Sequence, residues 1–152
     1  HTGRAAGTDG QTAVQYRHIE NPWGNILEFI DGINFNGGTT YVCADPTKYA
    51  DDIETGYIVI AYKLVGSGVG FSIKSVDLLP DAPYAFIPSA NIFGKNKYIP
   101  DCCVRGTTEG WRTLLVGGHS SHNDDAGLFC LYTSQATSFS ASTAGARLMF
   151  HP

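Results

Sequence analysis

The last third of the chain, residues 110–152, constrains the fold most, because two strand-like runs enclose a long segment of a different composition. The runs are GWRTLLVGG at residues 110–118 and GARLMFHP at residues 145–152. Between them, HSSHNDDAGLFCLYTSQATSFSASTA contains no Lys, Arg, Glu, Trp, Met or Pro. Ser, Thr and Asn adapt their hydrogen bonds and Tyr and Phe provide contact area, so this composition on a rigid support is typical of recognition surfaces. The pattern predicts a binding module.

Length and composition predict one folded domain. The chain has 152 residues, 43% of them hydrophobic, which is enough for one sizeable core. Residues 1–13 are small and polar and are expected to be a linker or a cloning remnant, and residues 14–152 form the domain. A formal net charge of -4 without a Lys or Arg run argues against nucleic acid as a partner. No apolar run approaches the roughly 20 residues that span a bilayer, so no membrane insertion is expected.

The 18 glycines and 7 prolines predict a loop-rich chain with short strands and two helices. Asp45 is expected to cap a short helix that has Pro46 at its first position and ends at Gly56. Asp31 and Gly32 are expected to close the apolar block at residues 26–30. Strands are expected at residues 39–43, 57–64, 111–117, 127–132 and 146–150, the last three in an antiparallel sheet. Residues 66–70 are expected to be a flexible connection, and residues 78–99 a long surface excursion.

The four cysteines, Cys43, Cys102, Cys103 and Cys130, are too few for a disulfide scaffold and lack the Cys-x-x-Cys spacing of zinc sites. One disulfide and free buried thiols are both open. Cys102 and Cys103 are adjacent, so their side chains point to opposite sides of an extended chain and cannot both face one cleft.

Three blocks carry a resemblance to a known family. RHIENPWGNILEFIDG (residues 17–32), GWRTLLVGG (110–118) and GARLMF (145–150) resemble conserved blocks of C-type lectin fold domains in phage tail and cell-surface ligand-binding proteins. They are most similar to the variable proteins of diversity-generating retroelements. The resemblance runs in order from about Tyr16 to Phe150. It implies an α+β C-type lectin fold, with short helices packed on small antiparallel sheets and long loops.

The same resemblance implies a fixed frame with variable, exposed positions between the frame residues. The implied frame residues are Gly117, Gly118, Ala126, Gly127, Leu128, Phe129, Gly145, Ala146, Arg147 and Leu148. The candidate ligand-binding residues are His119, Ser121, His122, Asp125, Cys130, Tyr132, Ser134, Gln135, Phe139, Ala141 and Thr143. Adenine mutagenesis of asparagine codons cannot produce Trp, Met, Lys, Glu or Gln, and between His119 and Ala144 only Gln135 breaks that rule.

The function implied is a receptor-binding domain of a phage tail fibre tip or a bacterial surface protein, presenting residues 118–144 to a protein or glycan receptor. The resemblance suggests a homotrimer, no cofactor is expected, and the chain is not expected to be an enzyme. One alternative comes from GNILEF at residues 24–29 and GAR at residues 145–147, which also resemble the formylglycine-generating enzyme superfamily. A structural cap domain of a tail or adhesin is a further alternative.

Other polar and aromatic residues have a structural and a functional interpretation. His119-x-x-His122 with Asp125 could bind a metal, but a solvated polar loop is favoured and no metal site is predicted. Trp23 and Trp111 are expected in the core. Glu28 and Arg147 lie in apolar blocks, so they either reach solvent or form an ion pair, with Glu28 to Arg147 and Asp31 to Arg147 as the two pairings considered.

Overall fold

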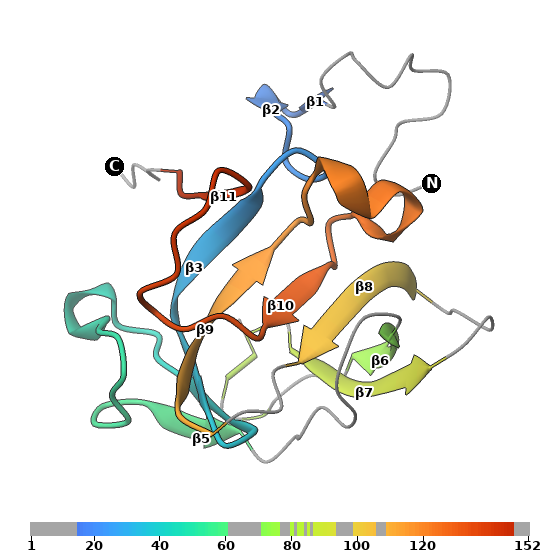
Figure 1. Cartoon of the computed structure of the whole chain (residues 1–152). Coiled ribbons are helices and arrows are strands. Elements are labelled where there is room, and N and C mark those ends of the chain that lie inside the picture. The colour runs from blue at the N-terminus through green and yellow to red at the C-terminus, as the bar shows by residue number, and fades with distance from the viewer. Residues whose placement is uncertain are drawn as a thin grey trace.

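The computed structural model describes residues 15–60, 71–76, 80, 82, 83, 85, 87–93, 99–105 and 109–147. The predicted linker and the predicted connection at residues 66–70 lie outside these residues. The strands are β1 Gln15–Tyr16, β2 Ile19–Glu20, β3 Leu27–Asn36, β4 Thr39–Val42, β5 Ile58–Ile60, β6 Phe71–Val76, β7 Pro88–Phe93, β8 Ile99–Arg105, β9 Trp111–Val116, β10 Leu131–Thr133 and β11 Ala144–Gly145. Two short 3-10 helices, η1 Pro46–Lys48 and η2 Ser120–Asp125, complete the described elements (Figure 1).

The predicted α+β class is wrong, and with it the C-type lectin fold that the class described. The described chain is mostly strand, and it contains no helix as long as two turns of α-helix. The helix start was predicted correctly, because Asp45 caps η1 and accepts from the backbone N–H of Thr47, with Pro46 following it. The helix ends at Lys48, however, and does not continue to Gly56. Neither helix of the described part is long and apolar enough to cross a membrane.

Nine of the described strands form one sheet in the order β5-β4-β3-β9-β10-β8-β6-β7, with β11 added beside β3. The central strand β9 runs antiparallel to both β3 and β10, whereas β10 runs parallel to β8 and β11 runs parallel to β3. The antiparallel arrangement expected for the last third therefore holds for β9 with β10 only. Strand β1 pairs with β2 in a separate hairpin, above the end of the large sheet in Figure 1.

Several predicted strand bounds shift. Strands β4 and β9 agree with prediction, and β5 covers Ile58–Ile60 of the run expected at residues 57–64, whose remainder is not described. Residues 127–130 form a turn, so β10 begins only at Leu131. The last described strand is β11, at Ala144–Gly145, and the strand expected at residues 146–150 is absent from its two described positions, 146 and 147.

The central strands place alternate side chains on opposite faces of the sheet, as strand geometry requires. Leu115, Cys102 and Tyr132 belong to one buried cluster. Their chain neighbours Leu114, Cys103 and Leu131 belong to the cluster on the other face. The prediction that Cys102 and Cys103 point to opposite sides is thereby confirmed. The two faces form separate halves of the core.

The expectation that Asp31 and Gly32 close an apolar block is wrong, because strand β3 continues through them with a bulge. Its register with β9 pairs Ile30 with Leu114 and then Asn34 with Thr113, so three residues of β3 are accommodated without partners on β9. Gly32 lies at a φ of +80° within this bulge, a conformation that glycine adopts without strain. A bulge lets a strand bend and continue, which explains why a turn-like dipeptide occurs inside a ten-residue strand.

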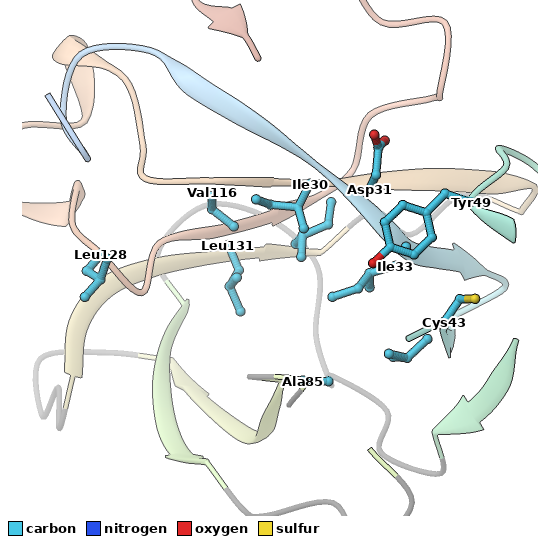
Figure 2. A pocket seen from close by; sticks show the side chains of 12 residues that line it. Ile30, Asp31, Ile33, Cys43, Tyr49, Ala85, Val116, Leu128 and Leu131 are labelled. Carbon is cyan, nitrogen blue, oxygen red and sulfur yellow. The ribbon is translucent and has the colours of Figure 1, made fainter. Parts of the chain in front are cut away.

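The segment at residues 78–99 is not a surface excursion alone. Ala82, Ala85 and Ile87 are buried and pack with Val42 and Ile60 in a third cluster. Between this cluster and the central strands lies an apolar cavity of about 280 Å³, and Figure 2 shows its side chains converging from the sheet and from Ala85. The sequence did not indicate these core residues, because proline and glycine interrupt any hydrophobic period of two or of 3.6 residues across the segment.

The bulge provides a direct test of the packing at Gly32. A Cβ on Gly32 would lie 2.6 Å from Cε1 of Tyr49, whereas one on Gly37, which also has a positive φ, would meet nothing within 4 Å. Gly32→Ala is therefore expected to lower the free energy of unfolding by about 1–2 kcal/mol more than Gly37→Ala. Urea denaturation measures both variants. Equal losses would show that the backbone conformation alone, and not Tyr49, sets the cost.

Candidate functional site

The segment that connects β9 to β10 is held against the sheet by tight backbone contacts. Gly117 and Gly118 both have a positive φ, and a Cβ on Gly118 would lie 2.9 Å from Cβ of Ala126. The backbone N–H of Gly117 donates to the carbonyl of Cys130, and that of Ser120 donates to the carbonyl of Asn25. The path of η2 is therefore fixed by backbone and by small residues, as the resemblance implied for Gly117, Gly118 and Ala126.

His122 on η2 is bonded at both ring nitrogens. Its Nδ1 accepts the backbone N–H of His119 at 3.0 Å, and its Nε2 lies 2.5 Å from the hydroxyl of Tyr132. A nitrogen that accepts an N–H carries no proton, so neutral His122 carries its proton on Nε2 and donates it to Tyr132. Burial, and next the neighbouring His119, lower the pKa of His122 below its usual 6.5, while Asp125 opposes the shift. The ring is therefore held neutral in one tautomer.

His119 and Tyr132 complete this cluster. The ring of His119 lies against that of His122, with centroids 3.7 Å apart, and its Nδ1 contacts the Ser121 hydroxyl at 2.8 Å. Burial, with a smaller effect from the charge of Asp125, raises the pKa of Tyr132 to about 12. Tyr132 therefore remains a neutral hydroxyl through the physiological range. Five of the predicted residues, His119, Ser121, His122, Asp125 and Tyr132, thus interact in one place.

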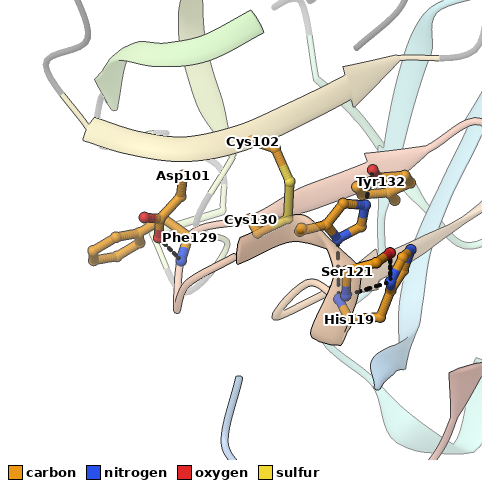
Figure 3. The surroundings of a disulfide bond; sticks show 8 residues. Asp101, Cys102, His119, Ser121, Phe129, Cys130 and Tyr132 are labelled. Carbon is orange, nitrogen blue, oxygen red and sulfur yellow. Dashed lines mark hydrogen bonds between the residues drawn. A yellow bond between two sulfur atoms is a disulfide. The ribbon is translucent and has the colours of Figure 1, made fainter. Parts of the chain in front are cut away.

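Beneath this cluster a disulfide joins Cys102 of β8 to Cys130 (Figure 3). Cys43 and Cys103 are free and buried, so the chain realises both alternatives that the sequence left open. Burial raises the pKa of the Cys103 thiol to about 11, which keeps it protonated and unreactive. The expectation that Cys130 is an exposed position is wrong, because its side chain is fully buried and bridged. Tyr132 is also buried, at 9% exposure, against the same expectation.

Asp101 anchors the turn that follows η2, a role that the sequence did not reveal. It is fully buried on β8, and its Oδ2 accepts the backbone N–H of Phe129 at 2.8 Å (Figure 3). Gly127 must lack a side chain here, since a Cβ would lie 2.3 Å from Asp101 Oδ2. The partner of Asp101 is 28 residues away in sequence, so no local pattern indicates the contact. Of the residues that the resemblance implied as frame, Gly127 is buried and Phe129 half-buried, whereas Leu128 is 58% exposed.

The return segment, residues 134–143, is also attached mainly through its backbone. The carbonyl of Gln135 accepts from Thr113 of β9, and the carbonyl of Thr143 accepts from Leu27 of β3. Within the segment, the backbone N–H of Phe139 donates to the carbonyl of Ala136. Because these bonds use no side chain of the segment, they are kept when its exposed side chains change; the Thr137 hydroxyl adds a side-chain bond to the Asp52 carboxylate at 3.1 Å.

Side chains near the end of the return segment alternate between exposed and half-buried, and the predicted ligand-binding residues occupy half-buried positions. Phe139, Ala141 and Thr143 are half-buried, and Phe139 packs against the cluster that contains Leu115 and Tyr132. The exposed residues are the serines between them, Ser138, Ser140 and Ser142, together with Ser120 and Ser121 on η2. Ser134 and Gln135 are half-buried and contact each other weakly, at 3.4 Å. Ser121 is therefore the one fully exposed candidate of the eleven.

Two charged residues next to this segment form the pair that the sequence offered as one alternative. Arg147 Nε lies 2.5 Å from Glu28 Oε1, and a second guanidinium nitrogen donates to the carbonyl of Asn21. The ion pair is close but poorly aligned, since Glu28 Oε1 has no hydrogen-bond partner. The pair borders a groove of about 740 Å³ that His18 and Phe29 also line. The Glu28–Arg147 ion pair joins β3 to the chain that follows β11.

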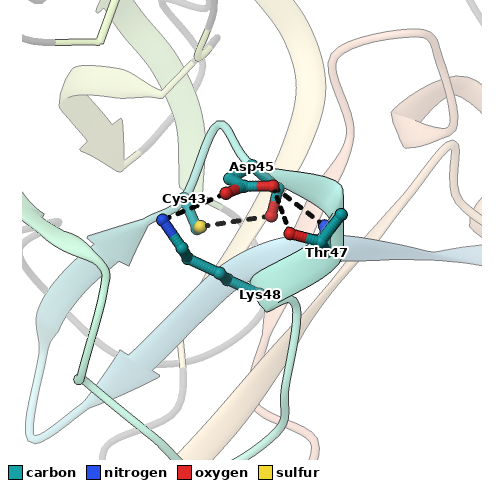
Figure 4. A network of polar contacts seen from close by, with 4 residues as sticks. All are labelled: Cys43, Asp45, Thr47 and Lys48. Atoms are coloured by element: carbon teal, nitrogen blue, oxygen red, sulfur yellow. Dashed lines mark hydrogen bonds and ion pairs between the residues drawn. The ribbon is translucent and has the colours of Figure 1, made fainter.

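Away from the segment, the remaining predicted features are structural. Trp23 and Trp111 are half-buried and not fully in the core, and Trp111 packs against Tyr41 with ring centroids 5.4 Å apart. The buried thiol of Cys43 donates to the carbonyl of Asp45, whose carboxylate binds Thr47 and Lys48 (Figure 4). The hydrogen bonds from Thr47, and next Lys48, lower the pKa of Asp45 to about 2.

The chain was compared with protein-family models, with curated proteins and with solved structures, and nothing matches. The arrangement of the segment between β9 and β11 is therefore the principal guide to function.

Phe139 and Ser140 test the alternation of the return segment. Phe139→Ala removes apolar area that packs on the core and is expected to lower the free energy of unfolding by about 1–3 kcal/mol. Ser140→Ala, at the exposed neighbour, is expected to change it by less than about 0.5 kcal/mol. Chemical denaturation compares the two variants. A small cost for both would mean that Phe139 belongs to the exposed surface, as the sequence predicted.

His122 predicts a dependence of stability on pH. Its pKa in the folded chain lies below the usual 6.5, so below about pH 6.5 the unfolded chain binds the proton more readily. The stability that neutral His122 contributes is present above that pH and is lost as pH falls through the lowered pKa. The difference in free energy of unfolding between wild type and His122→Asn is expected to shrink from about pH 7.5 to about pH 5. A constant difference would contradict this assignment.

Proposed function

We propose that this chain is a ligand-binding domain that presents residues 118–144 to a receptor outside the cell. One observation carries the proposal: this segment is attached to the sheet by its backbone, by a disulfide and by buried anchors, while five of its serines are exposed. A surface fixed in this way keeps its shape when the exposed side chains are exchanged. That property suits recognition of different targets, in line with the resemblance to variable proteins of diversity-generating retroelements.

The chemistry of the exposed surface favours a polar protein or glycan receptor. Hydroxyl groups of Ser121, Ser138, Ser140 and Ser142 donate and accept hydrogen bonds, and the ring of His119 contacts the Ser121 hydroxyl on η2. Small hydroxyl residues beside aromatic rings are the usual composition of adaptable binding loops. The binding surface therefore includes the serines that the sequence-based candidate list omitted.

The disulfide supports a location outside the cytoplasm, since such bonds persist in oxidising environments that include virion and cell surfaces. A phage tail fibre tip or a bacterial surface protein is such a place. Several copies in one trimeric fibre would raise weak single-site affinity through effective concentration. Nucleic acid remains an unfavoured partner, because the formal net charge is -4.

An enzyme of the formylglycine-generating type receives less support. Chemistry of that type would depend on a reactive cysteine pair or a metal centre in a defined cleft. The adjacent cysteines do not form such a pair, because Cys102 is bridged to Cys130 and Cys103 is a buried thiol on the other face of the sheet. A domain that only caps a fibre would not need a backbone-attached segment with exposed side chains. Ligand binding is therefore the function that the geometry supports best.

The exposed serines provide the test. Ser121→Tyr, Ser140→Tyr and Ser142→Tyr in one chain add bulk to the surface, so binding of the labelled protein to a panel of intact bacterial cells is expected to fall at least tenfold. The unfolding midpoint is expected to stay within a few degrees, because no buried contact changes. Flow cytometry measures binding, and circular dichroism measures the midpoint.

Val59→Tyr is the matched control, since Val59 lies outside residues 118–144 and is 60% exposed on β5, an edge strand of the large sheet. This variant is expected to bind cells as wild type does. Unchanged binding by the triple variant, or an equal loss in the control, would contradict the proposed surface.

A further inference from the structure

Three groups that bind soft metal ions lie together beneath η2. The sulfur atoms of Cys102 and Cys130 and one ring nitrogen of His122 all lie within 4.8 Å of one another. They come from β8, from the residue before β10 and from η2, so the fold and not local sequence gathers them. Two thiolates and one imidazole are the ligand set of zinc sites that keep a fourth position open. In the described structure the two sulfurs are joined as a disulfide.

The thiols would stay together after reduction, because the sheet positions them independently of the disulfide. Strand β10 pairs with β8 so that Leu131 lies opposite Cys103. Cys130 precedes Leu131 in the sequence, and Cys102 precedes Cys103. The Cα atoms of Cys102 and Cys130 are 4.7 Å apart. Around a tetrahedral zinc ion the sulfur and nitrogen ligands lie roughly 3.5–4 Å from one another. The sulfur and nitrogen atoms, which lie within 4.8 Å of one another, thus require only side-chain adjustment to bind an ion together.

The hydrogen bond to Tyr132 prepares His122 to act as a ligand. The proton on Nε2 is donated to the Tyr132 hydroxyl, which leaves the lone pair on Nδ1. That lone pair accepts the backbone N–H of His119, a bond that a metal ion would replace. A histidine ligand that donates its other ring proton to an oxygen is the usual arrangement around protein-bound zinc. The ring of His119 lies against that of His122, with centroids 3.7 Å apart.

We infer that the reduced chain binds one zinc-class ion through Cys102, Cys130 and His122, and that this ion replaces the disulfide as the link between β8 and the residue before β10 while also holding His122 of η2. Binding releases the two thiol protons as two metal–sulfur bonds form. An external disulfide then oxidises the two metal-bound thiolates: the two cysteine sulfurs form one bond, the ion leaves, and the external disulfide takes the two electrons and two protons from solvent and becomes two thiols. The same two cysteines thus link β8 to the residue before β10 under reducing and under oxidising conditions.

Cobalt and zinc ions alone serve as probes. The full chain is reduced with a phosphine, freed of reductant without oxygen and titrated with Co²⁺, and Zn²⁺ is then added in competition with a chromogenic chelator. One ion per chain is expected, with a thiolate-to-cobalt charge-transfer band and tetrahedral visible bands that Zn²⁺ abolishes. The oxidised chain, which has the same sequence and fold, is expected to bind at least a hundredfold more weakly.

Variants assign the ligands. Cys130→Ser is expected to lose the charge-transfer band and at least a hundredfold in affinity, and His122→Asn at least tenfold. Cys103→Ser, the adjacent free thiol on the other face of the sheet, is expected to bind as wild type does. Circular dichroism of each reduced variant confirms that it is folded. Equal affinity in the reduced and oxidised wild-type chain would overturn the inference, as would a loss in Cys103→Ser equal to that in Cys130→Ser. The metal titration uses no receptor, so it can fail or succeed independently of the proposed function.

Discussion

The parallel pairing of β10 with β8 is the constraint on which the rest of the candidate site depends. It places Leu131 beside Cys103, and it brings Cys130 to Cys102 and the turn at Phe129 to Asp101. Because a parallel pair has no short connection, these partners come from segments about thirty residues apart, and β9 lies between the segments in sequence. The position of η2 follows, since the chain from β9 must pass over the end of β10 before it can enter that strand.

Local sequence predicted the features that depend on neighbouring residues. β-Branched and aromatic residues predicted β4, and a buried-type run ending in Gly-Gly predicted β9. Asp45 with Pro46 predicted the start of η1, and the adjacency of Cys102 and Cys103 predicted their separation to two faces. The helical part of the fold class was wrong because a start signal does not determine length: η1 ends after three residues, within the polar run that follows it. The Asp31-Gly32 dipeptide predicts the end of the apolar block and not a bulge, since a turn dipeptide and a bulge require the same backbone conformation.

Features that depend on distant partners could not be predicted. Nothing near Asp101 indicates Phe129, and nothing near Cys130 indicates whether it is bridged, free or exposed. In the return segment the alternation itself was recognisable, but which alternate residues face the core depends on where the segment joins β3 and β9. Phe139 packs inward, so its neighbours Ser138 and Ser140 point outward. A composition typical of recognition surfaces thus indicates the segment without indicating the side chains that are presented.

The two halves of the proposed binding segment are therefore not equivalent. Residues 134–143 are attached through carbonyls and amide groups, which every residue type other than proline provides, so their outward side chains are replaceable. The half that contains η2 is attached through particular side chains: His122 to Tyr132, Cys130 to Cys102, and the close contact of Gly118 with Ala126. A different residue at Cys130 or His122 would change how η2 is held and not only what it presents. In the proposed function, diversity of binding would arise mainly from Ser138, Ser140 and Ser142 with Ser121, while the residues beneath η2 would set the shape in which that diversity is displayed.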